Sequence, residues 1–305
     1  MIVASIDIGT NTVLLLIAKL EKNTLIPLIN EYRIPRLGKG LKPGQNIVEN
    51  KTSLLFQILE EYKEIIEYYN CDDVILTGTY ALRVAANSDS IKEKIKNQFD
   101  YNLNIIDGET EAQIEYLAAI SNLKTIKGNL AVIDIGGGST ELIFGDSQKV
   151  NFKKSFSIGS VNGTEKYLFN SPPKKENLKL FQSELNLIFS ELNNQFDFQE
   201  AVAIAGTATT VACMCFGLND FIEEKVESAS LNSEAIEKLI DRISKLTSSE
   251  ILDQFGKIVN GREDIILAGA TILFSLMKKL KLNSVRVSSW GVRHGAILFK
   301  HLSKT

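Results

Sequence analysis

Two short stretches of the sequence place a carboxylate directly before a glycine-containing turn. Residues 6–12 read IDIGTNT and residues 133–141 read IDIGGGSTE, so Asp7 and Asp134 each end an apolar run. The backbone amides of such a turn can form a concave anion site. An ionised Asp at the end of a buried strand is costly unless it is solvated, paired or bound to a metal. One copy could be no more than a wide hairpin, but two copies favour a pair of phosphate-binding turns.

The residues after each turn decide what kind of phosphate site it can be. Rossmann and P-loop sites need a glycine turn that opens a helix, because the helix N-terminus holds the phosphate. Residues 141–145 read ELIFG, which is typical of a strand, and the pattern GxxxxGK[ST] is absent from the sequence. The sequence therefore predicts that each turn joins two antiparallel strands and that its amides project beyond the edge of a sheet.

The elements needed to position these turns occur in the same order twice. Apolar runs rich in β-branched residues predict strands, and apolar residues at helical spacing predict helices. In the first half we expect strands at 2–8, 13–18, 25–33 and 74–76, and helices at 54–69, 90–99 and 109–121. In the second half we expect strands at 130–135, 141–145, 149–158, 201–204 and 285–288, and helices at 177–192, from 247 onward, at 263–280 and at 291–302. The broken stretch 121–128 is the expected boundary, and the fold class is α/β.

Composition narrows the class of protein. A chain of 305 residues is long enough for two domains of ordinary size. The net charge of −3 argues against nucleic acid as a partner. We expect no signal peptide and no membrane partner, because the sequence has neither a basic leader nor a long apolar run. The three cysteines form no CxxC pair and no even disulfide set, which favours a reducing cytoplasm.

Seven short motifs follow one another along the chain. They are DIGTNT at 7–12, RLGKGL at 36–41, TYALR at 79–83, GETEA at 108–112, DIGGGSTE at 134–141, AGTATT at 205–210 and GVRHG at 291–295. Each motif alone is a weak signal. In this order and spacing they resemble the exopolyphosphatase and guanosine pentaphosphate phosphohydrolase family, within the superfamily of actin, sugar kinases and heat-shock chaperones. The resemblance covers essentially the whole chain.

The resemblance implies a fold and an activity. We expect two ribonuclease-H-like domains with an active-site cleft between them: one at 1–120, on which the C-terminal helix 290–305 packs, and one at 121–289. Because the sequence ends at residue 305, we expect the short form of the family, without accessory C-terminal domains. The expected enzyme is a phosphoanhydride hydrolase that releases terminal phosphate from polyphosphate, or alternatively the 5′-phosphate of guanosine pentaphosphate. Polyphosphate and guanosine penta- or tetraphosphate are the expected partners, and a homodimer is one possible assembly.

The resemblance also assigns roles to residues. Glu111 is the expected general base, which would orient and deprotonate the attacking water, and Asp134 and Arg83 are the other expected catalytic residues. The expected cofactor is Mg²⁺ or Mn²⁺, since Mg²⁺ prefers carboxylates together with substrate oxygens. Its candidate ligands are Asp7, Asp134 and Glu141. The phosphate-binding candidates are Gly9, Thr10, Asn11, Thr12, Gly136, Gly137, Gly138, Ser139, Gly206, Thr207 and Arg262, of which Gly206 and Thr207 are expected in a loop.

Other interpretations of these residues stay open. Glu111 could be an ordinary glutamate in the first turn of a helix, where the helix dipole favours it. Arg83 and Arg262 could clamp phosphate, because a guanidinium fork matches phosphate oxygens, or they could form structural ion pairs.

The sequence departs from the family pattern at four positions, and two other classes of function stay open. Leu14, Tyr80, Asn162 and His294 replace residues that are common in the family, and we expect these changes to affect substrate choice. A small-molecule kinase or ATPase would share both turns. An inert alarmone-binding protein would share the turns and lack the base, so the presence of Glu111 argues against it.

Overall fold

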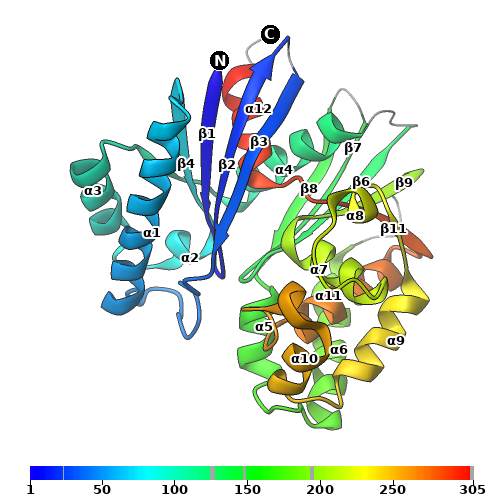
Figure 1. Cartoon of the computed structure of the whole chain (residues 1–305). Helices are drawn as coiled ribbons and strands as arrows, with labels where there is room; N and C mark the ends of the chain where they lie inside the picture. Colours follow the sequence, from blue (N-terminus) through cyan, green and yellow to red (C-terminus); the bar gives the residue numbers. More distant parts are fainter. Residues whose placement is uncertain (23, 124–127, 147–148, 193–195, 303–305) are drawn as a thin grey trace. The chain divides into compact units, whose positions relative to one another are not determined.

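The chain folds into two compact units, each built on its own sheet (Figure 1). The computed structural model describes residues 1–22, 24–123, 128–146, 149–192 and 196–302. Unit 1 comprises Met1–Ala118 and Gly291–Thr305, and unit 2 comprises Ala119–Trp290. Both units combine strands and helices, so the predicted α/β class with two sheets is confirmed.

The sheet of unit 1 has the strand order β3-β2-β1-β4-β5. Its strands are β1 (Ile2–Ile8), β2 (Val13–Glu21), β3 (Thr24–Arg33), β4 (Asp73–Gly78) and β5 (Leu103–Ile105). The first three strands form an antiparallel meander, and β4 and β5 run parallel to β1. The long apolar runs of β1 and β2 suit the middle of this sheet, because strands covered on both faces read as continuous hydrophobic segments.

The helices of unit 1 cover both faces of this sheet. They are α1 (Glu49–Tyr68), α2 (Tyr80–Val84), α3 (Ser88–Phe99), α4 (Gly108–Asn122) and α12 (Val292–Leu302). The apolar stripes of α1 and α3 form one core with alternate residues of the strands, including Ile6 and Ile8. Asp7 lies between these two residues and therefore faces the other side. On that side α12 packs on the strands, and Val292 forms a second apolar cluster with Ile114 of α4 and Ile75 of β4.

Unit 2 repeats this arrangement strand by strand. Its sheet reads β8-β7-β6-β9-β11-β10, with β6 (Leu130–Ile135), β7 (Thr140–Gly145), β8 (Val150–Phe156), β9 (Glu200–Ile204), β10 (Ser230–Asn232) and β11 (Ser284–Ser288). As in unit 1, three antiparallel strands are followed by two that run parallel to the first, and β10 is an addition at the edge. The repetition predicted from the duplicated turn motif is thus present in the sheet order.

The helices of unit 2 gather around one large hydrophobic core. They are α5 (Ser160–Tyr167), α6 (Lys175–Ile188), α7 (Ala205–Cys215), α8 (Glu223–Val226), α9 (Ser233–Ile243), α10 (Ser248–Phe255) and α11 (Ile266–Lys279), with short 3-10 segments at Phe189–Glu191 and Gly256–Val259. α11 is buried along most of its length and packs against α5, α6, α7 and α9. The capping box predicted at the start of α10 is confirmed: Thr247 and Glu250 bond reciprocally.

Some elements of the structure differ from those predicted from the sequence. The expected loop at Gly206 and Thr207 is wrong, because both residues lie in the first turn of α7. The sequence reading did not predict α5, α7 or α9. In the expected boundary 121–128, residues 124–127 lie outside the described part of the chain. Among the described helices, none combines the length and apolar character that a membrane span requires.

Candidate functional site

The first glycine turn joins β1 to β2 and is held by the segment that follows β3. The amide of Gly38 donates to the carbonyl of Thr10 at 2.8 Å, and the amide of Arg36 donates to the carbonyl of Asn11 at 3.0 Å. The C=O and N–H of a trans peptide group point in opposite directions. The amides of Asn11 and Thr12 therefore point away from this segment, and the RLG stretch fixes their direction.

Gly38 must be glycine for this contact to form. A Cβ atom at this position would lie 2.2 Å from Cγ2 of Thr10, far inside van der Waals contact. The turn itself is closed by a bond from the amide of Gly9 to the carbonyl of Thr12 at 2.9 Å. The motif at 36–41, to which the sequence assigned no role, thus packs directly on the first turn.

The second glycine turn joins β6 to β7 and is held by the N-terminus of α5. The amides of Ser160 and Val161 and the side-chain amide of Asn162 donate to three successive carbonyls, those of Gly136–Gly138, at 2.9, 2.7 and 2.8 Å. By the same peptide geometry, the amides of residues 137–139 point away from α5. The donors at the start of α5 are thus used to orient the turn.

Asn162 bridges the turn and the chain before α5. Its Oδ1 accepts a bond from the amide of Gly159 at 2.7 Å, while its Nδ2 donates to the carbonyl of Gly138. Gly159 approaches so closely that a Cβ there would lie 2.6 Å from the carbonyl of Gly137. This departure from the family pattern therefore has a structural role: it supports the second turn.

Two carboxylates lie side by side behind the second turn. Asp134 of β6 is the register partner of Glu141 of β7. Directly opposite residues of an antiparallel pair project to the same face of the sheet, with Cβ atoms about 4.5–5.5 Å apart. Asp134 is 6% exposed and Glu141 is 1% exposed, and Ser155 donates to Oε1 of Glu141 at 2.7 Å. A pair of buried carboxylates matches the ligands that Mg²⁺ prefers.

Unit 1 carries a single carboxylate at the equivalent place. Asp7 of β1 is the register partner of Leu14 of β2 and of Thr77 of β4. Leu14 thus occupies the position that corresponds to Glu141 in unit 2. The departure at residue 14 therefore leaves an apolar side chain next to Asp7, where unit 2 has a second carboxylate.

Glu111 is positioned by contacts on either side of it. Asp107 caps α4 by accepting the amide of Thr110 at 2.7 Å, so Glu111 lies in the first turn of that helix. Nη1 of Arg83 donates to Oε2 of Glu111 at 3.0 Å and to the carbonyl of Ile106 at 2.7 Å. The Glu111 side chain is 8% exposed and that of Arg83 is 23% exposed. The structure thus brings these two predicted residues together as an ion pair.

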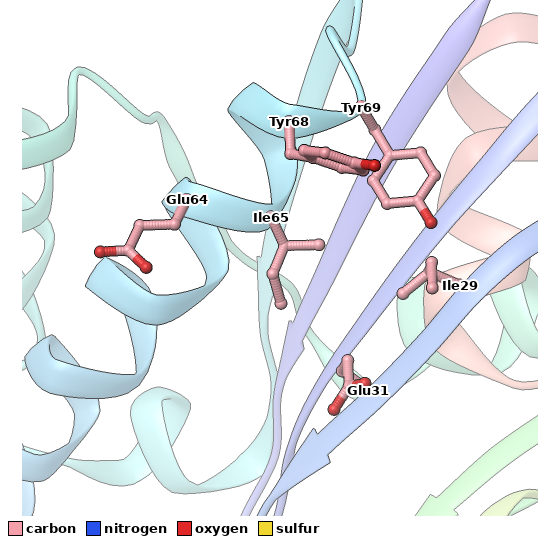
Figure 2. Close-up of a pocket in the computed structure, with 6 residues that line it drawn as sticks. All are labelled: Ile29, Glu31, Glu64, Ile65, Tyr68 and Tyr69. Carbon is pink, nitrogen blue, oxygen red and sulfur yellow. The ribbon is translucent and has the colours of Figure 1, made fainter.

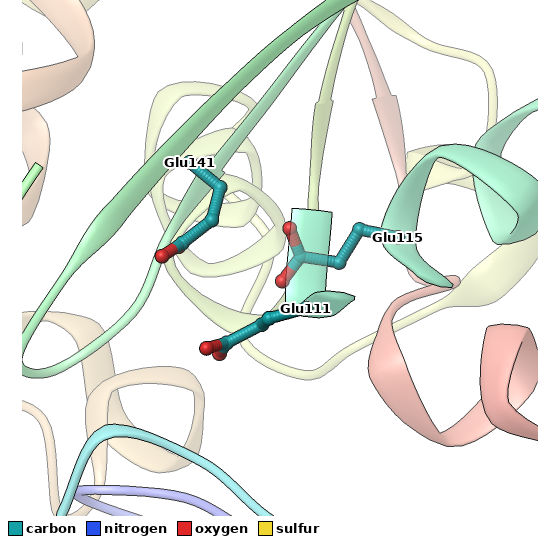
Figure 3. Close-up of side chains that lie close together, drawn as sticks. All are labelled: Glu111, Glu115 and Glu141. Carbon is teal, nitrogen blue, oxygen red and sulfur yellow. The ribbon is translucent and has the colours of Figure 1, made fainter. Parts of the chain in front are cut away.

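The sequence reading missed Glu115, which lies one turn further along α4. Glu115 is 1% exposed, and its candidate ligand oxygen lies within 4.8 Å of that of Glu111. Figure 3 shows both side chains leaving α4. The spacing of four residues on a helix was the available signal, because it places both carboxylates on one face.

The remaining predicted residues of unit 2 lie around the start of α7. Oγ1 of Thr207 donates to the carbonyl of Ile135 at 2.6 Å, which ties α7 to the strand that enters the second turn. A Cβ at Gly206 would lie 2.4 Å from Nη2 of Arg262, so the guanidinium packs on the backbone of this glycine. Gly206, Thr207 and Arg262 are therefore grouped in unit 2. Gly206 and Thr207 lie on a helix where a loop was expected, and Arg262 lies in the turn before α11.

A surface pocket in unit 1 contains none of the predicted residues. It has a volume of about 320 Å³ and lies between α1 and β3, as Figure 2 shows. Its lining residues are Ile29, Glu31, Glu64, Ile65, Tyr68 and Tyr69. The candidate site is thus defined by the two turns, their supporting segments and the carboxylates, and not by this pocket.

Comparison with known proteins agrees with the motifs. The model of the Ppx/GppA phosphatase family matches residues 16–304. A bifunctional 3-dehydroquinate synthase/phosphatase of Fusobacterium nucleatum is 29% identical over 317 residues, which span 97% of this chain and 46% of that longer protein. A putative exopolyphosphatase of Haemophilus influenzae is 27% identical over 97% of this chain and 90% of its own length.

A solved structure has the same fold along its whole length. The crystal structure of the Aquifex aeolicus member of the Ppx/GppA family matches with a TM-score of 0.86 and 31% identity, over 100% of this chain and 99% of that one. The resemblance predicted from the seven motifs is confirmed by this match and by the family model. The chain belongs to the Ppx/GppA phosphatase family.

Proposed function

We propose that the protein is a metal-dependent exopolyphosphatase that releases the terminal phosphate of polyphosphate. The observation that carries the proposal is the orientation of the two turns: the carbonyls of Thr10 and Asn11, and those of Gly136–Gly138, are taken up by other parts of the protein. The amides on the opposite side of these peptides form donor arrays suited to phosphate oxygens. Membership of the phosphatase family supports hydrolysis over mere binding.

Asp134 and Glu141 would hold the cation, Mg²⁺ or Mn²⁺, with Asp7 as a further candidate. When bound, the cation would neutralise part of the phosphate charge and assist departure of the leaving phosphate. The side-by-side register of Asp134 and Glu141 supports their assignment, since Mg²⁺ takes one or two carboxylates together with waters and substrate oxygens.

Glu111 would accept the proton of the attacking water. Arg83 would act through Glu111, because its Nη1 donates to that carboxylate and to a backbone carbonyl. Holding the base in one rotamer keeps the water in line with the bond that breaks, and such positioning is a large part of the catalysis of phosphoryl transfer.

The test is the release of inorganic phosphate from three substrates: long-chain polyphosphate, guanosine pentaphosphate and ATP. Each is incubated with the purified protein in Mg²⁺, in Mn²⁺ or in EDTA. We expect release from polyphosphate that requires the cation. The Glu111→Gln protein, purified in parallel, controls for contaminating phosphatases. Absence of release from every substrate in either cation would contradict the proposal.

The same measurements separate the alternatives. A higher kcat/KM for guanosine pentaphosphate than for polyphosphate would identify a guanosine pentaphosphate phosphohydrolase. Release from ATP alone would point to an ATPase or a small-molecule kinase. Binding of guanosine tetraphosphate without hydrolysis of any substrate would identify an alarmone-binding protein.

The proposal includes a reducing cytoplasm as the setting. All three cysteines, Cys71, Cys213 and Cys215, are free thiols. Burial raises the pKa of Cys213 to about 11 and that of Cys215 to about 12, so both stay protonated and unreactive at neutral pH. A homodimer is the assembly to test, by light scattering of the purified protein.

A further inference from the structure

The chain passes between the two units at two places. The first is α4, which begins in unit 1 and ends at Asn122 in unit 2. The second is the segment after β11, where the chain leaves unit 2 at Trp290 and enters α12. The first crossing matters for the proposed function, because the first turn of α4 carries Glu111.

One carboxylate of unit 2 binds both crossings. Oε1 of Glu227 accepts Nδ2 of Asn122 at 2.6 Å. Oε2 of Glu227 accepts the amide and the hydroxyl of Ser289, at 2.8 and 2.9 Å. Hydrogen bonds to an ionised carboxylate are about twice as strong as those between neutral groups. Glu227 therefore joins the last residue of α4 to the segment that leads into α12.

A second residue of unit 2, Ser288, also links the two crossings. Oγ of Ser288 accepts Nδ2 of Asn122 at 3.0 Å and the amide of Trp290 at 3.2 Å. Asn122 thus bridges the two crossings directly as well as through Glu227. Ser288 and Trp290 are buried, and Glu227, Asn122 and Ser289 are half-buried.

The same two elements also touch within unit 1. A Cβ at Gly295 of α12 would lie 1.9 Å from the carbonyl of Ile114 of α4, so the two helix backbones are in direct contact. α4 and the α12 segment are consequently held together on the unit 1 side by close packing and on the unit 2 side by Glu227. α4 is thus contacted near its middle by Gly295 and at its last residue by Glu227, so a shift or rotation of the helix would break one of these contacts.

We propose that Glu227 is a positioning residue of the enzyme. It fastens the C-terminal end of α4, and with it the return segment, so that Glu111 in the first turn of the same helix keeps its catalytic position. The inference rests on the proposed function of Glu111. Glu227 lies outside the seven sequence motifs and follows the short helix α8.

The test compares Glu227→Ala, Glu227→Gln and Asn122→Ala with the wild type. A shift of about 1 Å at a catalytic group can cost about a hundredfold in rate. We expect kcat on the best substrate to fall by about tenfold to a hundredfold in Glu227→Ala and Asn122→Ala, and by less in Glu227→Gln, which keeps one acceptor. KM should stay within about twofold, since the ground-state phosphates are held by the turns. Glu224→Ala removes an exposed carboxylate three residues earlier and should leave kcat unchanged.

The Glu111→Gln background separates positioning from general destabilisation. If Glu227 acts through Glu111, Glu227→Ala should lower kcat little further when the base is already absent. An equal fold-loss in both backgrounds, or a wild-type kcat in Asn122→Ala and in both Glu227 variants, would overturn the proposal.

Hydrogen exchange provides a measurement that does not depend on activity. The amides of residues 119–122 and 288–291 should exchange faster in Glu227→Ala and Asn122→Ala than in the wild type, because opening of these segments becomes easier. Unchanged exchange would show that Glu227 does not fasten the crossings. If the wild type releases no phosphate, the proposed function fails. The exchange result still decides whether Glu227 holds the two crossings in place.

Discussion

At the scale of single residues, Arg83 is placed to orient Glu111, the proposed base. Its Nη1 bonds both to Glu111 and to the carbonyl of Ile106, and its guanidinium carbon lies 5.7 Å from the ring centre of Tyr80. These two bonds use Nη1 alone of the three guanidinium nitrogens, and they hold the arginine against Glu111. The departure at Tyr80 thus supplies a cation–π contact that holds the arginine.

The first residue-scale prediction concerns Glu111→Gln. The substitution keeps size and hydrogen bonding and removes the ability to accept a proton. General base catalysis is typically worth about two to four powers of ten, so kcat should fall by about that factor while KM changes little. Steady-state phosphate release measures both constants, and Glu109→Gln, an exposed neighbour in the same turn, is the control. A variant that keeps more than about a tenth of the wild-type kcat would rule Glu111 out as the base.

The second residue-scale prediction concerns Asp134→Asn. Loss of one metal-binding carboxylate should weaken both metal binding and turnover, so kcat falls and the Mg²⁺ concentration for half-maximal rate rises. Excess Mg²⁺ should restore part of the rate, because Glu141 remains as its neighbour. Titration of phosphate release with Mg²⁺ checks this, and Glu111→Gln serves as the contrast because its loss should not respond to Mg²⁺. An Asp134→Asn protein with the wild-type Mg²⁺ dependence would remove Asp134 from the metal site.

Motifs in the sequence could identify the candidate residues but not the contacts that hold them. Asp7, Asp134 and Glu111 can be predicted as site residues because each belongs to a recognisable sequence motif. The supports come from elsewhere in the chain: Gly38 reaches the first turn from beyond β3, and Asn162 reaches the second from α5. Such pairings depend on how the elements pack, and a single sequence does not record them.

At the scale of elements, the two turns are built on one plan with different supports. In each, a neighbouring segment takes up the carbonyls and leaves the amides on the other side. Unit 1 uses backbone amides of an irregular segment, whereas unit 2 uses the first amides of α5 and a side chain. A helix N-terminus is often an anion site, but here the first amides of α5 donate to the turn carbonyls, and the proposed phosphate donors are the amides of the turn itself.

The element-scale prediction tests the support of the second turn. Asn162→Asp keeps an acceptor for the amide of Gly159, loses the donor to Gly138 and places a carboxylate beside a carbonyl. We expect KM to rise by about tenfold, corresponding to the loss of a hydrogen bond worth about 1.4 kcal/mol. Asn151→Asp adds the same charge at an exposed position of β8 and is the control. If Asn162→Asp and Asn162→Ala both keep the wild-type KM, Asn162 does not orient the turn.

The elements that the sequence predicted are those with a clear periodicity. The apolar runs of β1, β2, β6 and β7 and the stripe of α1 needed no tertiary information. α7 was missed because it reads AGTATTVACMC: it is buried on nearly all sides, so it has no polar face, and its Thr and Val residues favour strands. α9 has an amphipathic pattern and a cap at Asn232, so its signal was present in the sequence.

At the scale of the whole molecule, the duplicated motif corresponds to a duplicated sheet. The order β3-β2-β1-β4-β5 is matched by β8-β7-β6-β9-β11. The two copies have diverged in the residues that could bind a metal, since Asp7 faces Leu14 whereas Asp134 faces Glu141. The repeat can be predicted from the sequence because the same motif occurs twice. The difference between Leu14 and Glu141 can be interpreted only from the strand register.

The stability of the molecule should depend on pH through His294. This residue, at the start of α12, is 1% exposed, and its Nδ1 accepts the amide of Gly291 at 3.4 Å. Burial, and then the charge of Arg293, lower the pKa of His294 well below its usual value of 6.5. At pH values above 6.5 the ring is neutral in both the folded and the unfolded chain, so this group adds no pH dependence there.

The whole-molecule prediction follows from the lowered pKa of His294. As the pH falls below 6.5, the unfolded chain takes up a proton at residue 294 that the folded chain refuses, so the free energy of unfolding decreases. The slope from one such group is about 1.4 kcal/mol per pH unit. Asp73 affects stability only at lower pH. Burial raises the pKa of the Asp73 carboxyl, but Lys300 and then His301 outweigh burial, so the pKa is lower than its usual value of 3.8. The stabilisation from this carboxylate is therefore lost only as the pH falls below 3.8. Urea unfolding at pH 7.5, 6.5 and 5.5 should therefore show a steeper loss for the wild type than for His294→Asn, whose amide can accept the same bond without titrating. Equal slopes would show that His294 is charged in the folded protein or that its ring is open to water.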